Sequence, residues 1–342
     1  MRRSIKEEVK RLWRLCFDDT EAFIKLYFRD KYTSANNRCI IKDDRVIAAL
    51  QVLPYEMTFL DTRISTEYIS GACTHPAYRK QGLMAQLLET TLAQQYTEKI
   101  PLTFLIPATL PLIEYYRRFG FVPAFWSSVH DYRLDEIPRL QEAIRVVCPR
   151  GMQDMIWHYC TTHMSQRASC IQHSRMDYRV VTRDLHLAGG NIVSAYLHSH
   201  LVGVAFVIPT EQRVIIKDIF TDDPQVAYEI IARCMEYHNK KYARLFAPVK
   251  NEEDVMLSGM ARFVHLQSIL EQYAAVHPTA DKHIYLTDEQ LPENTAYYDI
   301  KEGSCRKSTE PQPNTSYTSL TIGQLTDAIL SPRTPFLSLM LN

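Results

Sequence analysis

The chain has 342 residues, 46% of them apolar, which is enough for two or three compact domains with cores of their own. Lys plus Arg and Asp plus Glu number 39 each, so the net charge is zero and the broad basic field of a nucleic-acid-binding protein is missing. The longest apolar run, 201–209, is far shorter than the roughly 20 residues of a membrane span. Eight scattered cysteines in a long chain favour reduced thiols in the cytoplasm. We therefore expect a cytoplasmic globular protein without a nucleic-acid or membrane partner.

The first third of the chain predicts helices and strands in alternation. A helical stretch up to about Tyr32 carries Glu7 and Glu8 and an apolar stripe, which indicates a structural helix and not a targeting signal. Gly71, inside a strand-like run, predicts a bulge or a close backbone approach. The later elements are expected as strands at 39–43, 46–60, 64–75 and 102–107, helices at 82–96 and 110–118, and a strand after Phe121. This order predicts a mixed α/β layer.

From about Ile144 the same pattern restarts, which predicts a diverged second copy. Asp222 and Asp223 stand in this copy where the first has a basic turn, and two carboxylates there would repel a phosphate. Its elements are expected as helices at 151–164 and 224–242 and strands at 191–199, 201–209, 213–221 and 243–249. The second copy is therefore not expected to bind an anion as the first does.

A third, smaller unit is expected from Gly259 onward. It contains a predicted strand at 282–288 and a polar, loop-like stretch at 301–319. The apolar end, 334–342, is expected to be docked, because chain ends without partners are usually polar and frayed. The predicted domains are therefore 1–135, 136–258 and 259–342.

The turn before the helix at 82–96 lacks an ordinary helix cap. A helix begins with about four backbone N–H groups without partners, and Ser, Thr, Asp or Asn normally caps them. Here Arg79, Lys80 and Gln81 precede Gly82 instead. These features predict a phosphate-binding site, because the positive end of the helix dipole and two cations attract an anion and the glycine admits its close approach. The alternative is a solvated surface turn. No G-x-x-x-x-G-K-S/T or G-x-G-x-x-G turn follows a strand, so ATP and NAD are poorly supported.

The stretch "ACTHPAYRKQGLMAQLL" at 72–88 resembles the acetyl-CoA signature of the GNAT acetyltransferases, although Met84 replaces the usual small residue. The resemblance implies acetyl-CoA as cosubstrate, with its pantetheine arm added to the strand like another strand and its pyrophosphate held by the amides of 81–84. GNAT enzymes transfer the acetyl group directly, and a strand cysteine is more often core than a nucleophile. The residues so implied in binding are Ala72, Cys73, Thr74, Arg79, Lys80, Gln81, Gly82, Leu83 and Met84.

The resemblance extends to the enhanced-intracellular-survival (Eis) branch of this family. It is carried by "FLIPATLPLIEYYRRFGFVPAF", "GMARFVHLQSILEQYAA" and "LTDEQLPENTAYYDI". It implies tandem GNAT domains with mixed sheets, a second copy without the pyrophosphate turn, and a small sterol-carrier-like C-terminal domain. Members of this branch often form oligomers, so a homo-oligomer is expected.

Acetyl transfer to an amine needs a proton returned to the departing thiolate and a base for the amine. Tyr116 occupies the place of the branch's general acid, a role that suits a phenol with an ordinary pKa of about 10. Packing is the alternative for both tyrosines of this helix, with Tyr115 as the spare. The branch implies that the base is the C-terminal carboxylate, here that of Asn342; Glu67, acting through a water, is the fallback.

Two C-x-x-H pairs, Cys160 with His163 and Cys170 with His173, resemble zinc ligands at first sight. The spacing between the pairs is short, and partly buried helix turns explain the same residues, so no metal is expected. The leading hypothesis is an acetyl-CoA-dependent N-acetyltransferase that modifies a primary amine of an aminoglycoside-like, polyamine or lysine-type acceptor. The alternative is a non-catalytic acyl-CoA-binding or scaffold protein that retains the fold.

Overall fold

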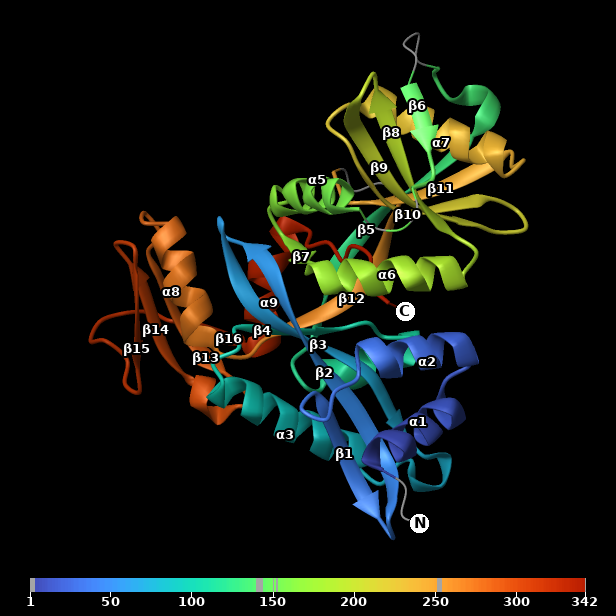
Figure 1. Cartoon of the computed structure of the whole chain (residues 1–342). Helices are drawn as coiled ribbons and strands as arrows, with labels where there is room; N and C mark the ends of the chain where they lie inside the picture. The colour runs from blue at the N-terminus through green and yellow to red at the C-terminus, as the bar shows by residue number, and fades with distance from the viewer. Residues whose placement is uncertain (1–3, 140–143, 150, 152, 251–253, 342) are drawn as a thin grey trace. The chain divides into compact units, whose positions relative to one another are not determined.

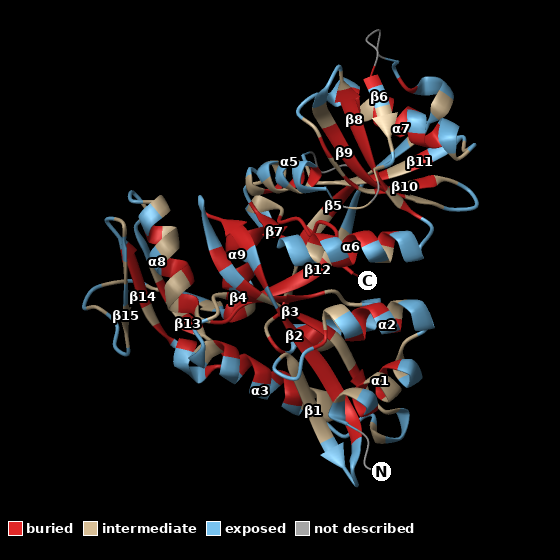
Figure 2. Ribbon diagram, viewed as in Figure 1, coloured by how far each residue is buried: buried red, intermediate tan, exposed pale blue. Residues whose placement is uncertain are grey.

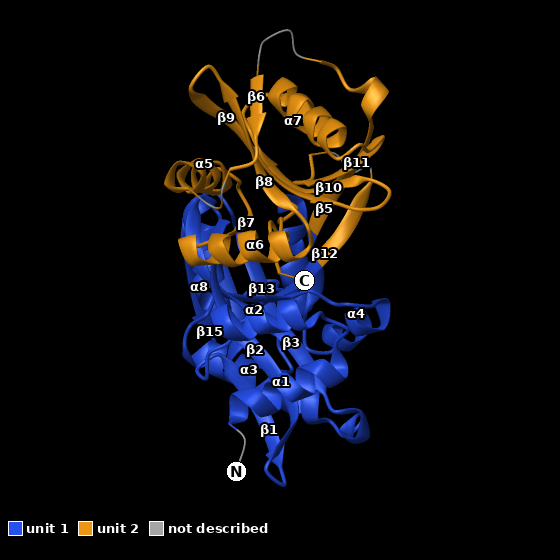
Figure 3. Cartoon of the chain, turned by 45° about the vertical axis from the view of Figure 1, so that its right-hand side comes forward, with its two compact units in different colours: residues 1–125, 259–333 blue, residues 126–258, 334–342 orange. Residues whose placement is uncertain are grey.

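The computed structural model describes residues 4–139, 144–149, 151, 153–250 and 254–341. The chain forms two compact units, shown in different colours in Figure 3. The first unit combines Met1–Phe125 with Gly259–Arg333, and the second combines Trp126–Ser258 with Thr334–Asn342. The division at 135 and 258 into three domains stays a prediction. None of the described helices is long and apolar enough to cross a bilayer.

The first unit begins with two helices, α1 (Ile5–Cys16) and α2 (Glu21–Asp30), where one helical stretch was expected. The separation has a local cause. The hydroxyl of Thr20 accepts a hydrogen bond from the Phe23 N–H at 3.2 Å and so starts a new helix, as Ser4 does for α1. Each helix buries an apolar face of its own, and Trp13 belongs to the buried face of α1.

An antiparallel meander follows, made of β1 (Asn37–Lys42), β2 (Arg45–Phe59) and β3 (Thr62–Thr74) (Figure 1). Asp43 and Asp44 form the turn between β1 and β2, and both have positive φ, at 49° and 61°. Figure 2 shows the buried residues concentrated along β2 and β3, whereas β1 is half-buried to exposed. β2 in particular is buried over most of its length, which makes it a central strand of the core.

A parallel strand is then added by a helical crossover, as parallel pairing requires. α3 (Leu83–Thr97) leads from β3 to β4 (Leu102–Leu105), and α4 (Leu110–Arg117) follows. On its other side β4 pairs antiparallel with the end of β12 (Val255–Phe263), through residues 260–263. The core between α3 and the sheet contains Leu88, Leu92 and Phe121.

The remainder of the first unit is a small four-stranded sheet with two helices. The strand order is β15-β14-β13-β16. The stretch at 301–319, expected to be a loop, contains β15, because β14 provides an antiparallel partner for a polar edge strand. The elements are α8 (Leu266–Val276), β13 (Lys282–Thr287), β14 (Ala296–Lys301), β15 (Ser304–Ser308), β16 (Thr318–Thr321) and α9 (Ile322–Leu330).

The second unit repeats the plan of the first. β10 and β11 are parallel and are joined by α7, as β3 and β4 are joined by α3, so the predicted second copy is confirmed. Its elements are β5 (Val122–Arg133), β6 (Ile144–Val147), α5 (Asp154–Ser165), β7 (Cys170–Gln172), α6 (Arg175–Leu187), β8 (Asn191–Leu197), β9 (His200–Pro209), β10 (Val214–Phe220), α7 (Pro224–Tyr237) and β11 (Tyr242–Ala247).

The apolar end of the chain is docked in the second unit, as expected. The Phe336 carbonyl accepts a hydrogen bond from the Ile171 N–H at 3.3 Å, and the Ser338 carbonyl lies 2.7 Å from the His173 Nε2. Residues 335–341 are buried. Asn342, the predicted source of the base, lies outside the described residues, so the role of the C-terminal carboxylate stays a prediction.

Candidate functional site

β3 extends past its parallel partner and leaves an open edge. Its pairing with β4 covers residues 66–69 and ends where Ile69 lies opposite Leu105. The His75 N–H donates to the Ile47 carbonyl of β2 at 2.8 Å. Because successive residues of a strand direct their backbone groups to opposite sides, those of Ala72 and Thr74 face away from β2, toward the open edge. This edge can accept an added strand.

The bulge predicted at Gly71 is present just before this edge. The pairing of β2 with β3 shifts register there, and Gly71 has a φ of +58°. A Cβ atom on Gly71 would lie 2.2 Å from the Trp13 ring, so a larger residue would collide with α1. Gly71 therefore serves both as the bulge and as the point where α1 approaches the strand.

The turn after β3 leaves the start of α3 uncapped. Gly82 occupies the N-cap position with a φ of +79° and makes no side-chain cap hydrogen bond. The first helical bond runs from the Gln86 N–H to the Gly82 carbonyl at 3.0 Å, and within the described part of the chain nothing accepts from the amides of 83–85. A Cβ atom on Gly82 would meet nothing within 4 Å. The helix end therefore offers free donors to an approaching anion.

One cavity of about 810 Å³ brings the open edge and the helix end together. Of the nine predicted binding residues and Tyr116, Gln81 alone does not line it. Met84, which replaces the expected small residue, lies in its wall. The lining residues are Cys16, Phe17, Ala72, Cys73, Thr74, Tyr78, Arg79, Lys80, Gly82, Leu83, Met84, Ala85, Ala108, Thr109, Leu112, Tyr115, Tyr116 and Arg118.

Tyr116 reaches the cavity from α4 and is 7% exposed. Burial raises its pKa above the ordinary value, so the phenol holds its proton firmly. Tyr115 also borders the cavity, with its ring centroid 5.4 Å from that of Tyr116, and the Arg118 guanidinium lies 4.6 Å from the Tyr115 ring centroid. Both tyrosines also pack against the core, so their packing and their access to the cavity coexist.

Glu67, the alternative base, does not line this cavity. It is half-buried on β3, not exposed as a solvated strand residue would be. Its carboxylate accepts a hydrogen bond from the Gln95 side chain of α3 at 2.7 Å, and desolvation raises its pKa. The structure therefore connects Glu67 to the α3 side of the sheet.

A buried ion pair that sequence reasoning missed supports the end of α4. Arg262 of β12 is fully buried and pairs with Asp288 at 2.6 Å. Its guanidinium also donates to the Phe119 carbonyl, three residues after Tyr116. The signal for it was an arginine within the apolar run "GMARFV", because a buried arginine requires a carboxylate partner.

The second copy has filled the corresponding helix end. Asp223 caps α7 and accepts a hydrogen bond from the Gln225 N–H at 2.8 Å, and Pro224 removes another donor. The expected contrast between the two turns is therefore present: the first turn leaves its donors free and the second satisfies one with a carboxylate.

The two C-x-x-H pairs lie in the second unit, where their histidines have other partners. His163 contacts the Tyr159 carbonyl at 2.9 Å and Asp222 at 3.2 Å, and His173 contacts the Ser338 carbonyl. Among the residues that the structure describes, no three or more His, Cys, Asp or Glu side chains are arranged to hold a metal ion.

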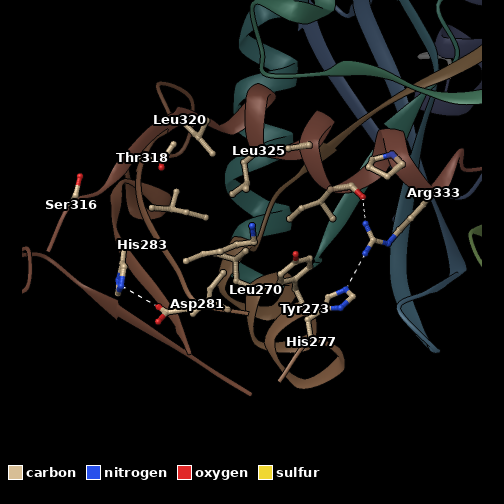
Figure 4. A pocket seen from close by; sticks show the side chains of 16 residues that line it. Leu270, Tyr273, His277, Asp281, His283, Ser316, Thr318, Leu320, Leu325 and Arg333 are labelled. Atoms are coloured by element: carbon tan, nitrogen blue, oxygen red, sulfur yellow. Dashed lines mark hydrogen bonds and ion pairs between the residues drawn. The ribbon is translucent and has the colours of Figure 1, made fainter. Parts of the chain in front are cut away.

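A second cavity of the first unit, about 660 Å³, is lined by residues of α8, α9, β13, β14 and β16 (Figure 4). Its wall is largely apolar, with Leu270, Leu320 and Leu325 directed into it. Arg333 contacts His277 at 3.2 Å at one side of it. None of the residues that the sequence predicted for acetyl-CoA binding or catalysis lines this cavity.

Comparison with known proteins finds a family match for the first third of the chain. Residues 1–124 match the family model described as an acetyltransferase (GNAT) domain. Two curated proteins from Streptomyces griseus, both named uncharacterized N-acetyltransferases, are 33% identical over 86 residues, or 25% of this chain. The chain spans only 20% of the length of these relatives.

Solved structures match nearly the whole chain in fold. A probable N-acyltransferase from Enterococcus faecalis has a TM-score of 0.77 at 17% identity, covering 95% of this chain and 87% of its own. A GCN5-related N-acetyltransferase from Anabaena variabilis has a TM-score of 0.74 at 16% identity, covering 98% of both chains. Eis1 from Mycobacterium abscessus has a TM-score of 0.73 at 13% identity, and the match covers 95% of this chain and 87% of Eis1. Residues 1–124 thus resemble a GNAT acetyltransferase domain, and the chain shares its fold with these solved structures.

Proposed function

We propose that this chain is an acetyl-CoA-dependent N-acetyltransferase that moves an acetyl group directly to a primary amine. The observation that carries the proposal is that one cavity borders the open edge of β3, the uncapped start of α3 and the Tyr116 side chain. A ligand with amide groups along a flexible arm and a pyrophosphate at its end matches the first two features. The GNAT domain match supports the same ligand.

In this proposal the backbone groups of Ala72 and Thr74 pair with the pantetheine arm, and Cys73 between them belongs to the same strand segment. The amides from Gln81 to Met84 hold the pyrophosphate, with the free donors of the first turn of α3 aimed at it. Arg79 and Lys80 add positive charge at the same turn. In this proposal the backbone donors and the two side-chain charges hold the anion together.

The chemistry is attack by a neutral amine on the thioester carbonyl carbon. The C–N bond forms, the C–S bond breaks, and the Tyr116 hydroxyl donates its proton to the departing sulfur. The raised pKa of Tyr116 keeps this proton in place until negative charge develops on the sulfur beside it. The proton from the amine nitrogen passes to a base, which we propose is the C-terminal carboxylate of Asn342, with Glu67 acting through a water as the fallback.

The acceptor is proposed as an aminoglycoside-like, polyamine or lysine-type amine. A non-catalytic acyl-CoA-binding or scaffold protein is the second candidate, and the capped turn of the second copy favours it, because this chain tolerates a copy without a working anion site. A sterol-carrier-like fold for 259–342 and a homo-oligomer remain predictions of the resemblance.

Release of free CoA thiol from acetyl-CoA, measured against a panel of amines, tests the proposal. We expect amine-dependent release, and Arg79→Ala is expected to raise the KM for acetyl-CoA with a smaller effect on kcat. Arg117→Ala is the matched control, since Arg117 is exposed on α4 and outside the cavity wall. Acetyl-CoA binding without release for any amine would favour the scaffold protein.

Extension of the chain beyond Asn342 tests the proposed base. Added residues remove the carboxylate from its position, so turnover is expected to fall while acetyl-CoA binding persists. Full activity in the extended protein, together with loss of activity in Glu67→Gln, would transfer the role of base to Glu67.

A further inference from the structure

Cys16 and Cys73 form a thiol pair at the open edge of β3, and the proposed reaction uses neither thiol. Cys16 ends α1 and Cys73 lies within β3, and both line the same cavity. An interaction with the other thiol shifts the pKa of each of them. The Cys16 thiol also contacts the Thr74 carbonyl at 3.5 Å. Because Thr74 directly follows Cys73, this contact places the Cys16 thiol beside the strand segment that carries Cys73, where a disulfide bond of roughly 2.05 Å would join the two sulfurs.

The two thiols have unequal surroundings, which assigns them different chemical roles. Cys16 is half-buried at the cavity wall, and its hydrogen bond with Cys73, helped by Arg79, lowers its pKa to about 7. Cys73 is 6% exposed, and the hydrogen bond with Cys16 together with burial raises its pKa. Cys16 is thus the accessible nucleophile and Cys73 the nearby thiol that can resolve an oxidised Cys16.

We propose that Cys16 and Cys73 form a reversible disulfide that closes the acetyl-CoA site under oxidation by a peroxide. The Cys16 thiolate attacks the terminal peroxide oxygen, the O–O bond breaks, and Cys16 becomes a sulfenic acid while the peroxide is reduced to an alcohol or water. The Cys73 thiol then attacks the Cys16 sulfur and expels water. In total, two thiols and one peroxide give one disulfide, one alcohol or water, and one further water. A dithiol reductant reverses the change.

The position of the pair explains why the disulfide would exclude acetyl-CoA, a consequence that rests on the proposed function. The Thr74 carbonyl faces the open edge, where the pantetheine arm would pair, and the Cys16 thiol already contacts that carbonyl. A covalent bond to Cys73 would hold Cys16 and the adjacent Phe17 against this edge, and both residues belong to the cavity wall. Acetyl-CoA, once bound, would in turn cover Cys16 and slow its oxidation.

Mass spectrometry of the full chain after hydrogen peroxide treatment tests the disulfide itself. We expect a linked pair of tryptic peptides, 15–25 and 64–79, that is two hydrogens lighter than the separate peptides and that disappears after treatment with a reductant. Brief iodoacetamide labelling should modify Cys16 at lower pH than Cys148, an accessible thiol whose pKa is raised by partial desolvation. Peroxide treatment that oxidises Cys148 but leaves peptides 15–25 and 64–79 unlinked would overturn the proposal.

Acetyl-CoA titration before and after peroxide tests the closure of the site. The Kd is expected to rise at least about tenfold on oxidation and to recover with reductant, whereas the ratio of the two Kd values should stay near one in Cys16→Ser. Cys39→Ser is the matched control, since Cys39 lies on β1 outside the cavity wall, and it should keep the response. A linked protein with unchanged Kd would refute closure. If the parent protein forms the disulfide on oxidation but binds no acetyl-CoA in its reduced state, the proposed function is refuted instead.

Discussion

Replacing Gly82 with Asp would give the first turn the carboxylate cap that the second copy has. Gly82 holds the N-cap position of α3 without a side-chain cap, and Asp223 shows what an aspartate does at the corresponding place in α7. Open space around Gly82 leaves room for the new side chain. The change should therefore satisfy an amide that the proposed pyrophosphate requires and add a like charge at the same place.

The expected effect on stability is small because two contributions oppose each other. A residue with a side chain in the left-handed conformation costs about 1–2 kcal/mol, and a new N-cap hydrogen bond returns about 0.5–2 kcal/mol. The effect on binding is larger. Loss of the helix-end attraction costs about 0.3–2 kcal/mol, and repulsion between unit charges about 5 Å apart adds up to ~3 kcal/mol at an effective dielectric constant of about 20. A Kd raised by about twofold to several thousandfold is therefore expected.

Calorimetric titration with acetyl-CoA measures this change, and thermal unfolding checks the fold. Gly82→Asn retains the cap without the charge and should weaken binding less. Gly189→Asp is the control for strain alone, since Gly189 has a φ of +74° in open space within the second unit. Unchanged acetyl-CoA affinity in a folded Gly82→Asp protein would refute the assignment of this helix end to the pyrophosphate.

Three further predictions concern turnover, pH and stability. Tyr116→Phe should lower kcat about 100-fold with little change in acetyl-CoA affinity, and Tyr115→Phe should not; equal kinetics for both variants would remove Tyr116 as the acid. Burial raises the pKa of Tyr116 above its ordinary value of about 10, so loss of its proton should not lower kcat between about pH 7 and 9.5. A fall of kcat within that pH range that disappears in Tyr116→Phe would contradict this expectation. Asp288→Asn leaves the buried Arg262 without its carboxylate partner and should lower the free energy of unfolding by about 3–5 kcal/mol in denaturant titration. The control Asp131→Asn, at an exposed ion pair, should lower it by less than about 1 kcal/mol. Similar losses in both variants would refute a special contribution of the buried ion pair.

The uncapped turn before α3 was predictable from sequence because its signals are local. An uncapped helix start, two cations and Gly82 lie within a few residues of one another, and the fold keeps them together in one cavity. The bulge at Gly71 was predictable for the same reason, since an isolated glycine in a strand has few other uses.

The rest of the site depends on contacts between distant parts of the chain. Cys16 reaches the Thr74 carbonyl across 58 positions, and Arg262 reaches the Phe119 carbonyl across 143. No periodicity or spacing encodes such pairs. β15 was missed for a related reason: an edge strand that is polar on both faces becomes a strand only through its partner, and its sequence alone resembles a loop.

Hydrogen exchange of individual backbone amides, with and without saturating acetyl-CoA, tests whether the open edge of β3 and the uncapped start of α3 hold this ligand. We predict slower exchange at Ala72 and Thr74 and in the first turn of α3, with unchanged exchange at the start of α7, where Asp223 already caps the helix. Protection centred on residues 223–227, or exchange across 70–86 that acetyl-CoA leaves unchanged, would contradict it.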